Sequence, residues 1–334
     1  MVSCSDCGLT FTLNPDYQAE RYAAVYQGAQ MDDESVYTSP LARLHLEVSS
    51  KLRLPPRLTT VEKFALRWLR KSAPVGAVIL DIGCGSGRFL RACGRVGFEA
   101  VGVEISSDVV AALLGAGLQA ILGMAPDFTW DGPDPFALTF FEVIEHLPDP
   151  RKEILELRRR FPRSVIIASV PSHFRRNPAA TGRRGASDYP PNHFLRWTPK
   201  ALELFFRKCG YGHVQVFLPP PDGSEFLPSL GYLLGKMGLL HSSSTRAQAS
   251  RGLGSSACPT HWWPLIAFLT LFVHRLYQLM SDIVGWPKAL HASRVGISSA
   301  SMLVIASPGG AHGAFCSCLV HSTRSLTIPQ AKAI

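Results

Sequence analysis

An acid and three glycines in the stretch VILDIGCGSGRFL (residues 78–90) are the first residues whose types and spacing indicate chemistry. Asp81 follows an apolar run that is typical of a buried strand, and Gly83, Gly85 and Gly87 come directly after it. Glycine allows a sharp backbone bend and leaves room for a ligand to approach the main chain closely. The stretch therefore predicts a ligand-binding turn between a strand and a helix.

The charge at this turn distinguishes a ligand that binds through a phosphate from one that carries a positive charge. A dinucleotide-binding turn has glycine at the first, third and sixth places of its motif, but here the sixth place is Arg88. Asp81 would repel a phosphate and attract a cation. A second acid, Glu104, ends the next predicted strand, where an acid can accept hydrogen bonds from both ribose hydroxyls. The combination predicts a nucleoside with a positive charge, and the alternative is a tight turn beside a surface acid.

These segments resemble the S-adenosylmethionine-dependent methyltransferases of the seven-stranded, Rossmann-like class. VILDIGCGSGRFL resembles their first motif and VGVEIS (residues 101–106) their second. FFEVIEHLPDP (residues 140–150) is similar to the fourth-strand segment of the branch that contains ubiquinone-type O-methyltransferases. The resemblance extends over residues 77–217.

The resemblance implies that S-adenosyl-L-methionine is the cofactor and that the acid and glycines of the first motif contact its methionine end. Two departures from the family pattern concern adenine binding and the fourth strand. Met124 and Ala125 stand where an acid usually binds the adenine amino group, and Ala137 stands where the fourth strand often has Asp. The residues expected to contact the cofactor are Asp81, Gly83, Cys84, Gly85, Gly87, Glu104, Ile105, Asp127 and Glu142.

Two carboxylates and an imidazole follow the predicted fourth strand at Glu142, Glu145 and His146. Spacings of three and four would place them on one face of a helical turn, as ligands for Mg²⁺ or a similar divalent cation. Similar segments bind a divalent metal in small-RNA 2′-O-methyltransferases and ubiquinone-type enzymes, whereas many relatives carry Glu-His without a known metal. Shaping of the cofactor or substrate pocket, and hydrogen bonding within the core, are the alternatives.

Methyl transfer to oxygen requires alignment and a base, and the candidate catalytic residues are His146, His193 and Glu145. His193 belongs to SDYPPNHFLRWTP (residues 187–199), a segment that is similar to one in many uncharacterised bacterial methyltransferases. We expect substrate contacts from the same loop, with a structural turn and a core tryptophan as the alternative. The residues concerned are Asp188, Tyr189, Asn192 and Trp197.

Cys4 and Cys7, followed by Gly8, resemble the second half of a small zinc ribbon. Tetrahedral zinc needs four ligands, and only this pair is close in sequence, so a zinc site would need ligands from elsewhere. The chain has eight cysteines, which are scattered. No export signal is recognisable at the amino terminus, and we expect reduced thiols and a cytoplasmic protein.

Short apolar strands and amphipathic helices alternate along the part of the chain that must position these residues. This alternation predicts an α/β fold with a doubly wound, mostly parallel seven-stranded sheet. The strands are predicted at residues 78–80, 100–103, 120–122, 136–140, 165–170, 214–217 and 302–306, and the helices at residues 59–71, 88–96, 107–114, 150–160 and from residue 198 onward.

Composition divides the chain further. The expected parts are a small cysteine-containing segment (1–40), the S-adenosylmethionine-binding core (41–218), an insertion or lid with an apolar helix (219–296), a last core strand (297–307) and a poorly ordered tail (308–334). The apolar run 262–273 is shorter than the ~20 residues that a membrane-spanning helix needs. We expect a buried or lid helix there, with contact to a membrane surface as the alternative.

The formal net charge of +9 comes from dispersed basic residues, which is ordinary for a solvated surface. The function that the resemblance implies is methyl transfer to an oxygen, rather than nitrogen or carbon, of a small-molecule, sugar or lipid-linked acceptor. One alternative is an RNA 2′-O-methyltransferase with a divalent metal, indicated by the charge and the Glu-x-x-Glu-His segment. The other is a non-catalytic binding protein on a degenerate methyltransferase fold, indicated by Ala137 and the missing adenine-binding acid.

Overall fold

The structure is a computed structural model that describes residues 1–12, 56–172 apart from 126 and 148, 193–220, selected helical positions between 265 and 290, and 301–309. The predicted substrate residues Asp188, Tyr189 and Asn192 lie outside the described residues, as does most of the expected tail.

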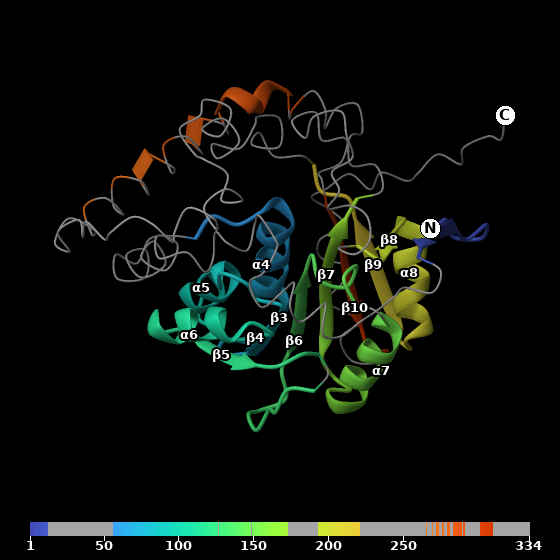
Figure 1. The fold of residues 1–334 in the computed structure, drawn as a ribbon, viewed down its shortest axis with the longest axis horizontal. Coiled ribbons are helices and arrows are strands. Elements are labelled where there is room, and N and C mark those ends of the chain that lie inside the picture. The colour runs from blue at the N-terminus through green and yellow to red at the C-terminus, as the bar shows by residue number, and fades with distance from the viewer. Residues whose placement is uncertain are drawn as a thin grey trace, which may run out of the picture.

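Seven strands form one sheet in the order β5-β4-β3-β6-β7-β10-β9 (Figure 1). The first five are parallel to their neighbours, and β10 is antiparallel to both β7 and β9. The predicted doubly wound, mostly parallel seven-stranded sheet is thus confirmed. The strands are β3 (Val78–Ile82), β4 (Glu99–Glu104), β5 (Gln119–Leu122), β6 (Ala137–Phe141), β7 (Val165–Pro171), β9 (His213–Phe217) and β10 (Ser301–Ser307).

Helices cover both faces of this sheet. They are α4 (Thr60–Ser72), α5 (Arg88–Arg95), α6 (Ser107–Gly115), α7 (Pro150–Arg160) and α8 (Pro199–Lys208). Successive strand residues point to opposite faces, so Ile79 packs with α4 and α5 while Leu80 packs with α7 and α8. Side chains cap four of the helices, among them Thr59 at α4 and Asp149 at α7. The exception is α5, whose amino terminus has Gly87 and no side-chain cap.

A second, small sheet has no counterpart in the sequence-based prediction. Its strands are β1 (Val2–Ser3), β2 (Thr10–Phe11) and β8 (Leu195–Arg196), in that order and antiparallel. Two side chains reinforce it, because Thr198 Oγ1 donates to the Cys7 carbonyl and Lys200 Nζ to the Asp6 carbonyl. The amino-terminal hairpin is therefore attached to the segment that follows His193.

The apolar run after residue 262 is helical at the positions described between 265 and 290. Its described large apolar side chains, beginning with Leu265 and Leu269, are about half exposed, so the expectation of a buried helix is wrong, and that of a lid helix stays a prediction. Among the described residues, no helix has the length and apolar character needed to cross a membrane.

Glu153 on α7 is an acid that is buried on one side of the sheet. Its Oε2 atom is buried without a hydrogen-bond partner among the described residues. Burial, with the nearby charges of Asp149 and Asp127, raises the pKa of Glu153 to about 8. The folded state therefore holds a proton that the unfolded state releases near its ordinary pKa, and stability falls as the pH rises from that value toward 8.

We expect Glu153→Gln to raise the melting temperature by about 3 °C or more at pH 9 and to change it little at pH 5, because the glutamine cannot ionise. Thermal denaturation at both pH values measures the effect. Glu156→Gln, which changes a partly exposed acid on the same helix that is paired with Arg159, is the control, and its effect should be the same at both pH values. An equal change for Glu153→Gln at both pH values would contradict the assignment of a neutral buried acid.

Candidate functional site

The three glycines of the turn after β3 have different surroundings. All have left-handed backbone angles, with φ of 68° at Gly83, 49° at Gly85 and 66° at Gly87. A Cβ atom at Gly83 would lie 2.7 Å from Val143, and one at Gly87 would lie 2.6 Å from Leu113. At Gly85 a Cβ atom would meet nothing within 4 Å. Packing thus explains two glycines, while Gly85 faces open space where a ligand can approach the backbone.

Cys84 contributes its backbone to this turn and its side chain to the core. A Cβ atom at Gly102 of β4 would lie only 2.3 Å from the Cys84 sulfur, so the thiol occupies the space that Gly102 leaves. Burial raises the pKa of the Cys84 thiol well above its ordinary value. The thiol is therefore a packing group rather than a nucleophile.

Asp81 lies at the end of β3 with only 2% of its surface exposed. Thr139 of β6 donates a hydrogen bond of 2.6 Å from its Oγ1 to the carboxylate. Burial raises the pKa of Asp81 to about 7, against the opposing effect of the Thr139 hydrogen bond. The group is therefore close to half ionised at neutral pH, and a neighbouring cation would favour its charged form.

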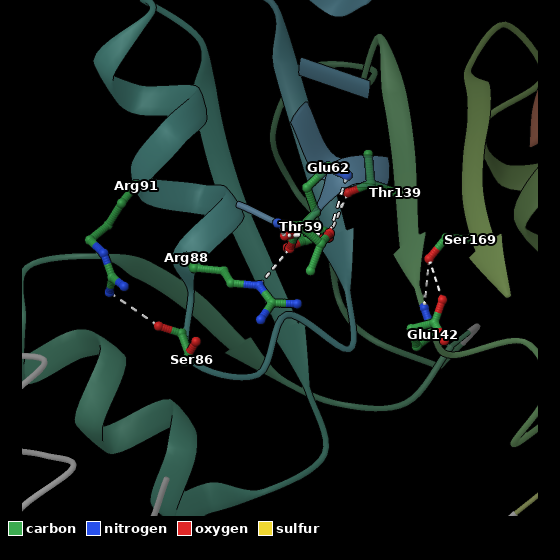
Figure 2. A network of polar contacts seen from close by, with 9 residues as sticks. Thr59, Glu62, Ser86, Arg88, Arg91, Thr139, Glu142 and Ser169 are labelled. Atoms are coloured by element: carbon green, nitrogen blue, oxygen red, sulfur yellow. Dashed lines mark hydrogen bonds and ion pairs between the residues drawn. The ribbon is translucent and has the colours of Figure 1, made fainter. Parts of the chain in front are cut away.

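Glu62 connects the amino termini of α4 and α5 beside this turn (Figure 2). Its Oε2 accepts hydrogen bonds from the Thr59 N–H (2.7 Å) and hydroxyl (2.8 Å). Its Oε1 accepts from Arg88 Nε at 2.7 Å. Thr59 is the N-cap of α4, and the pairing of Glu62 with Arg88 joins two helices that sequence spacing does not relate.

Glu104, at the end of β4, faces the same turn. Its Oε2 accepts a hydrogen bond from the Gly85 N–H at 3.0 Å. Its Oε1 accepts from the N–H groups of Ile105 (2.8 Å) and Ser106 (3.2 Å). With 8% of its surface exposed, Glu104 is a buried acid. The two acids that the sequence singled out therefore flank the glycine turn from adjacent strands.

Glu142 follows β6 in a left-handed conformation with φ of 57°, which is uncommon for a residue other than glycine. Its carboxylate accepts a hydrogen bond of 2.8 Å from the Ser169 hydroxyl of β7 (Figure 2). The following residues form a turn, closed by a hydrogen bond from His146 N–H to the Val143 carbonyl. The expectation of a helical turn with Glu142, Glu145 and His146 on one face is therefore wrong.

The structure instead groups Glu145 and His146 with His193. One potential ligand atom from each of the three lies within 4.8 Å of the others. His146 Nε2 is 4.0 Å from Glu145 Oε1, and the two imidazole rings are edge to face with centroids 4.6 Å apart. Glu145 is fully buried, and its carbonyl accepts from the Phe194 N–H at 3.1 Å. The two candidate bases are thus neighbours, and a carboxylate with two imidazoles is a set that can hold a divalent metal.

The other predicted site residues are more dispersed. Trp197 is 1% exposed and packs edge to face on Phe205, so it is a core residue and presents almost no surface to a substrate. Asp127 is exposed in a turn after β5, and Ile105 is partly buried directly after Glu104. Ala137 is fully buried at the start of β6, away from the strand ends that carry the acids. An acid is therefore not required there for the glycine turn to form.

Cys4 and Cys7 lie in the turn between β1 and β2. Gly8 N–H donates to the Cys4 carbonyl and Cys4 N–H to the Leu9 carbonyl. Hydrogen bonds from the backbone of Cys7 and Asp6 lower the pKa of the Cys4 thiol. Within the described part of the chain, no third metal-binding side chain joins this pair.

The core is similar in sequence to known proteins. Residues 57–216 match a family described as a methyltransferase domain. A ubiquinone biosynthesis O-methyltransferase from Thiobacillus denitrificans is 32% identical over 110 residues, which are 30% of this chain and 47% of that protein. One from Ralstonia nicotianae is 25% identical over 212 residues, 56% of this chain and 81% of that protein. The chain thus spans about half the length of the first of these relatives.

A solved S-adenosylmethionine-dependent methyltransferase from Archaeoglobus fulgidus also aligns with the structure. The alignment covers 74% of this chain and 94% of that chain, with 16% identity and a TM-score of 0.40.

Gly85 provides a test of the open side of the turn. We expect Gly85→Ala to cost about 1 kcal/mol of backbone strain and to weaken S-adenosylmethionine binding by at least about tenfold, because the new methyl group points into the ligand space. Gly117→Ala is the matched control, since Gly117 also has a positive φ (75°) and an open Cβ direction.

Titration calorimetry and thermal denaturation measure both effects. The control should lose similar stability and keep its cofactor affinity. Equal affinity in Gly85→Ala and Gly117→Ala would contradict a ligand at Gly85.

Proposed function

We propose that the protein transfers a methyl group from S-adenosyl-L-methionine to an oxygen of a small-molecule, sugar or lipid-linked acceptor, because residues 57–216 match a methyltransferase domain family. The observation that carries the proposal is the pair of buried acids, Asp81 and Glu104, on either side of the open Gly85. We propose oxygen as the atom that accepts the methyl group because the relatives from Thiobacillus and Ralstonia are named O-methyltransferases.

The residues around the turn fit the charges of this cofactor. Asp81 would hold the positively charged methionine end, and Gly85 would let it lie against the backbone. Glu104 would accept hydrogen bonds from the ribose hydroxyls. When bound, the cofactor supplies a methyl group on a cationic sulfur, which keeps the electrons of the broken S–C bond and becomes a neutral thioether.

An oxygen acceptor must lose its proton as the new O–C bond forms. We assign that proton to His146 or His193, because the two imidazoles are neighbours and His146 lies just after β6, the strand beside β3. The buried Glu145 carboxylate, 4.0 Å from His146 Nε2, would stabilise the imidazolium. The proton thus goes to an imidazole and the methyl group to the oxygen.

The same three side chains are candidate ligands of a divalent cation. Two imidazoles and one carboxylate suit Zn²⁺ or another transition metal better than Mg²⁺, which prefers oxygen ligands. An imidazole bound to a metal cannot also accept the proton, so the two roles of this cluster exclude each other for a given residue. The zinc proposal for Cys4 and Cys7 has less support, because only two ligands are present there among the described residues.

Asp81 provides the first test of the function. If only the ionised carboxylate binds the cofactor and its pKa is about 7, the affinity should rise by about tenfold between pH 6 and pH 8. Asp81→Asn should weaken binding and abolish the pH dependence. Asp134→Asn, an exposed acid in the loop before β6, should bind like the wild type.

Calorimetry with S-adenosylmethionine at both pH values gives the answer. Wild-type affinity in Asp81→Asn would overturn the proposed function.

The histidine cluster provides the second test. We expect His146→Ala and His193→Ala each to lower turnover by about 100-fold or more and to leave cofactor affinity within about twofold of wild type. His213→Ala, an exposed histidine on β9, is the control. Turnover is measured as S-adenosylhomocysteine formed with a panel of phenolic, sugar and lipid-linked hydroxyl acceptors.

Further measurements on the wild type and the two histidine variants distinguish a metal-binding role of the cluster from a role as base. If the cluster holds a metal, chelation lowers wild-type turnover, and a Co²⁺ absorption band present in wild type is lost in both variants. If it acts as base alone, chelation has no effect, and turnover falls as the pH drops below the pKa of the imidazoles. Wild-type turnover in both variants would contradict either role.

A further inference from the structure

Nine large apolar residues on the helix between 265 and 284 are exposed to solvent. Between 46% and 57% of the surface of each is exposed. They are Leu265, Leu269, Phe272, Val273, Leu276, Leu279, Met280, Ile283 and Val284, which we call the apolar face. In Figure 1 the described pieces of this helix (orange) lie apart from the ribbons of the seven-stranded sheet.

These residues lie on one side of the helix. With about 100° of rotation per residue, they occupy an arc of about 140° that contains no polar residue among those described. On a helical wheel drawn from the sequence alone, the opposite half is mostly polar, with Thr270, His274, Arg275, Gln278, Ser281 and Asp282 beside Ala267, Leu271 and Tyr277. The pattern is that of an amphipathic helix, whose apolar side would normally be buried against another structure.

Other exposed apolar residues of the described chain do not gather in this way. Val75, Leu114, Leu122 and Leu155 are exposed singly on separate elements, which is ordinary for a protein surface. A contiguous row of nine large apolar side chains instead indicates a site of interaction.

Charge and aromatic residues around the apolar face favour a lipid surface. The segment 262–294 has three basic residues, Arg275, Lys288 and Arg294, against one acid, Asp282. Trp286, which is 62% exposed, and the exposed Lys288 follow the carboxyl end of the face. Tryptophan prefers the level of lipid headgroups, and basic residues attract anionic lipids.

Topology relates this helix to the candidate site. Both β7 and β9 are antiparallel to β10, so β9 ends at the same edge of the sheet as β7 and the parallel strands beside it. The chain leaves that edge after Phe217 and returns to it at Ser301. The segment that contains the apolar face is therefore inserted at the edge that carries Asp81, Glu104 and Glu142.

We propose that the apolar face binds the surface of an anionic phospholipid bilayer, with the helix lying in the plane of the interface. Helices with an apolar arc, a polar opposite side and neighbouring basic and tryptophan residues bind membranes in this way without spanning them. The proposal concerns membrane attachment and does not depend on the identity of the methyl acceptor.

Vesicle flotation with the full chain tests the proposal. We expect wild type to float with phosphatidylglycerol–phosphatidylcholine vesicles, and to bind pure phosphatidylcholine vesicles more weakly. Phe272→Asp and Leu276→Asp should each lower the partition coefficient by at least about tenfold, because a charge enters the buried apolar side. Leu114→Asp, which changes a 54% exposed leucine on α6, should float like wild type.

The fold and the cofactor site are monitored in the same proteins, by thermal denaturation and by calorimetry with S-adenosylmethionine. Both should be unchanged in the three variants, so failure of membrane binding is distinguishable from failure of the proposed function. Absence of wild-type flotation, equal flotation of all variants, or equal binding to both vesicle types would overturn the proposal. A dimer that Phe272→Asp dissociates, without flotation of wild type, would identify the face as an interface between copies.

Discussion

The hydrogen bond from the Gly85 N–H to Glu104 is the interaction on which the character of the site depends. A phosphate bound at a glycine turn is held by the backbone N–H groups of that turn. Here the N–H groups of all three glycines are already donated within the protein, from Gly83 to the Val103 carbonyl, from Gly85 to Glu104 and from Gly87 to the Cys84 carbonyl. The three glycines therefore present acids and an open backbone to a ligand, rather than unused donors, and this disfavours a phosphate at the glycines themselves.

The features that could be predicted from the sequence depend on local signals. Strong apolar runs specified the strands, and the order of acid and glycines specified the turn, because both signals are local. Ile79 and Leu80, neighbours on β3, show why the sheet was recognisable, since each packs into a different core. On the side expected to bind adenine, Asp127 is exposed, and no other described acid directly follows β5.

Features that depend on contacts between distant segments were not predictable in this way. The strands β1, β2 and β8 have two residues each and carry no periodic pattern. The approach of His193 to His146 brings together residues far apart in the sequence. The positive φ of Glu142 prevents the helical turn on which the expected grouping with Glu145 was based. Trp197 is ambiguous in sequence because a tryptophan in a loop suits both a core and a binding site.

The positions of the two histidines depend on two separate parts of the fold. His146 belongs to the turn after β6, whereas His193 precedes β8. The strand β8 pairs with β2 of the amino-terminal hairpin, and Thr198 and Lys200, which follow β8, donate hydrogen bonds to that hairpin. The insertion between β9 and β10 begins and ends at the edge of the sheet on which that cluster and the glycine turn lie. A helix of this insertion bound to a bilayer would tether that edge to the membrane through the chain on either side of the helix. Among the three acceptor classes, the proposed membrane attachment would favour the lipid-linked one, because such an acceptor is held in the same bilayer.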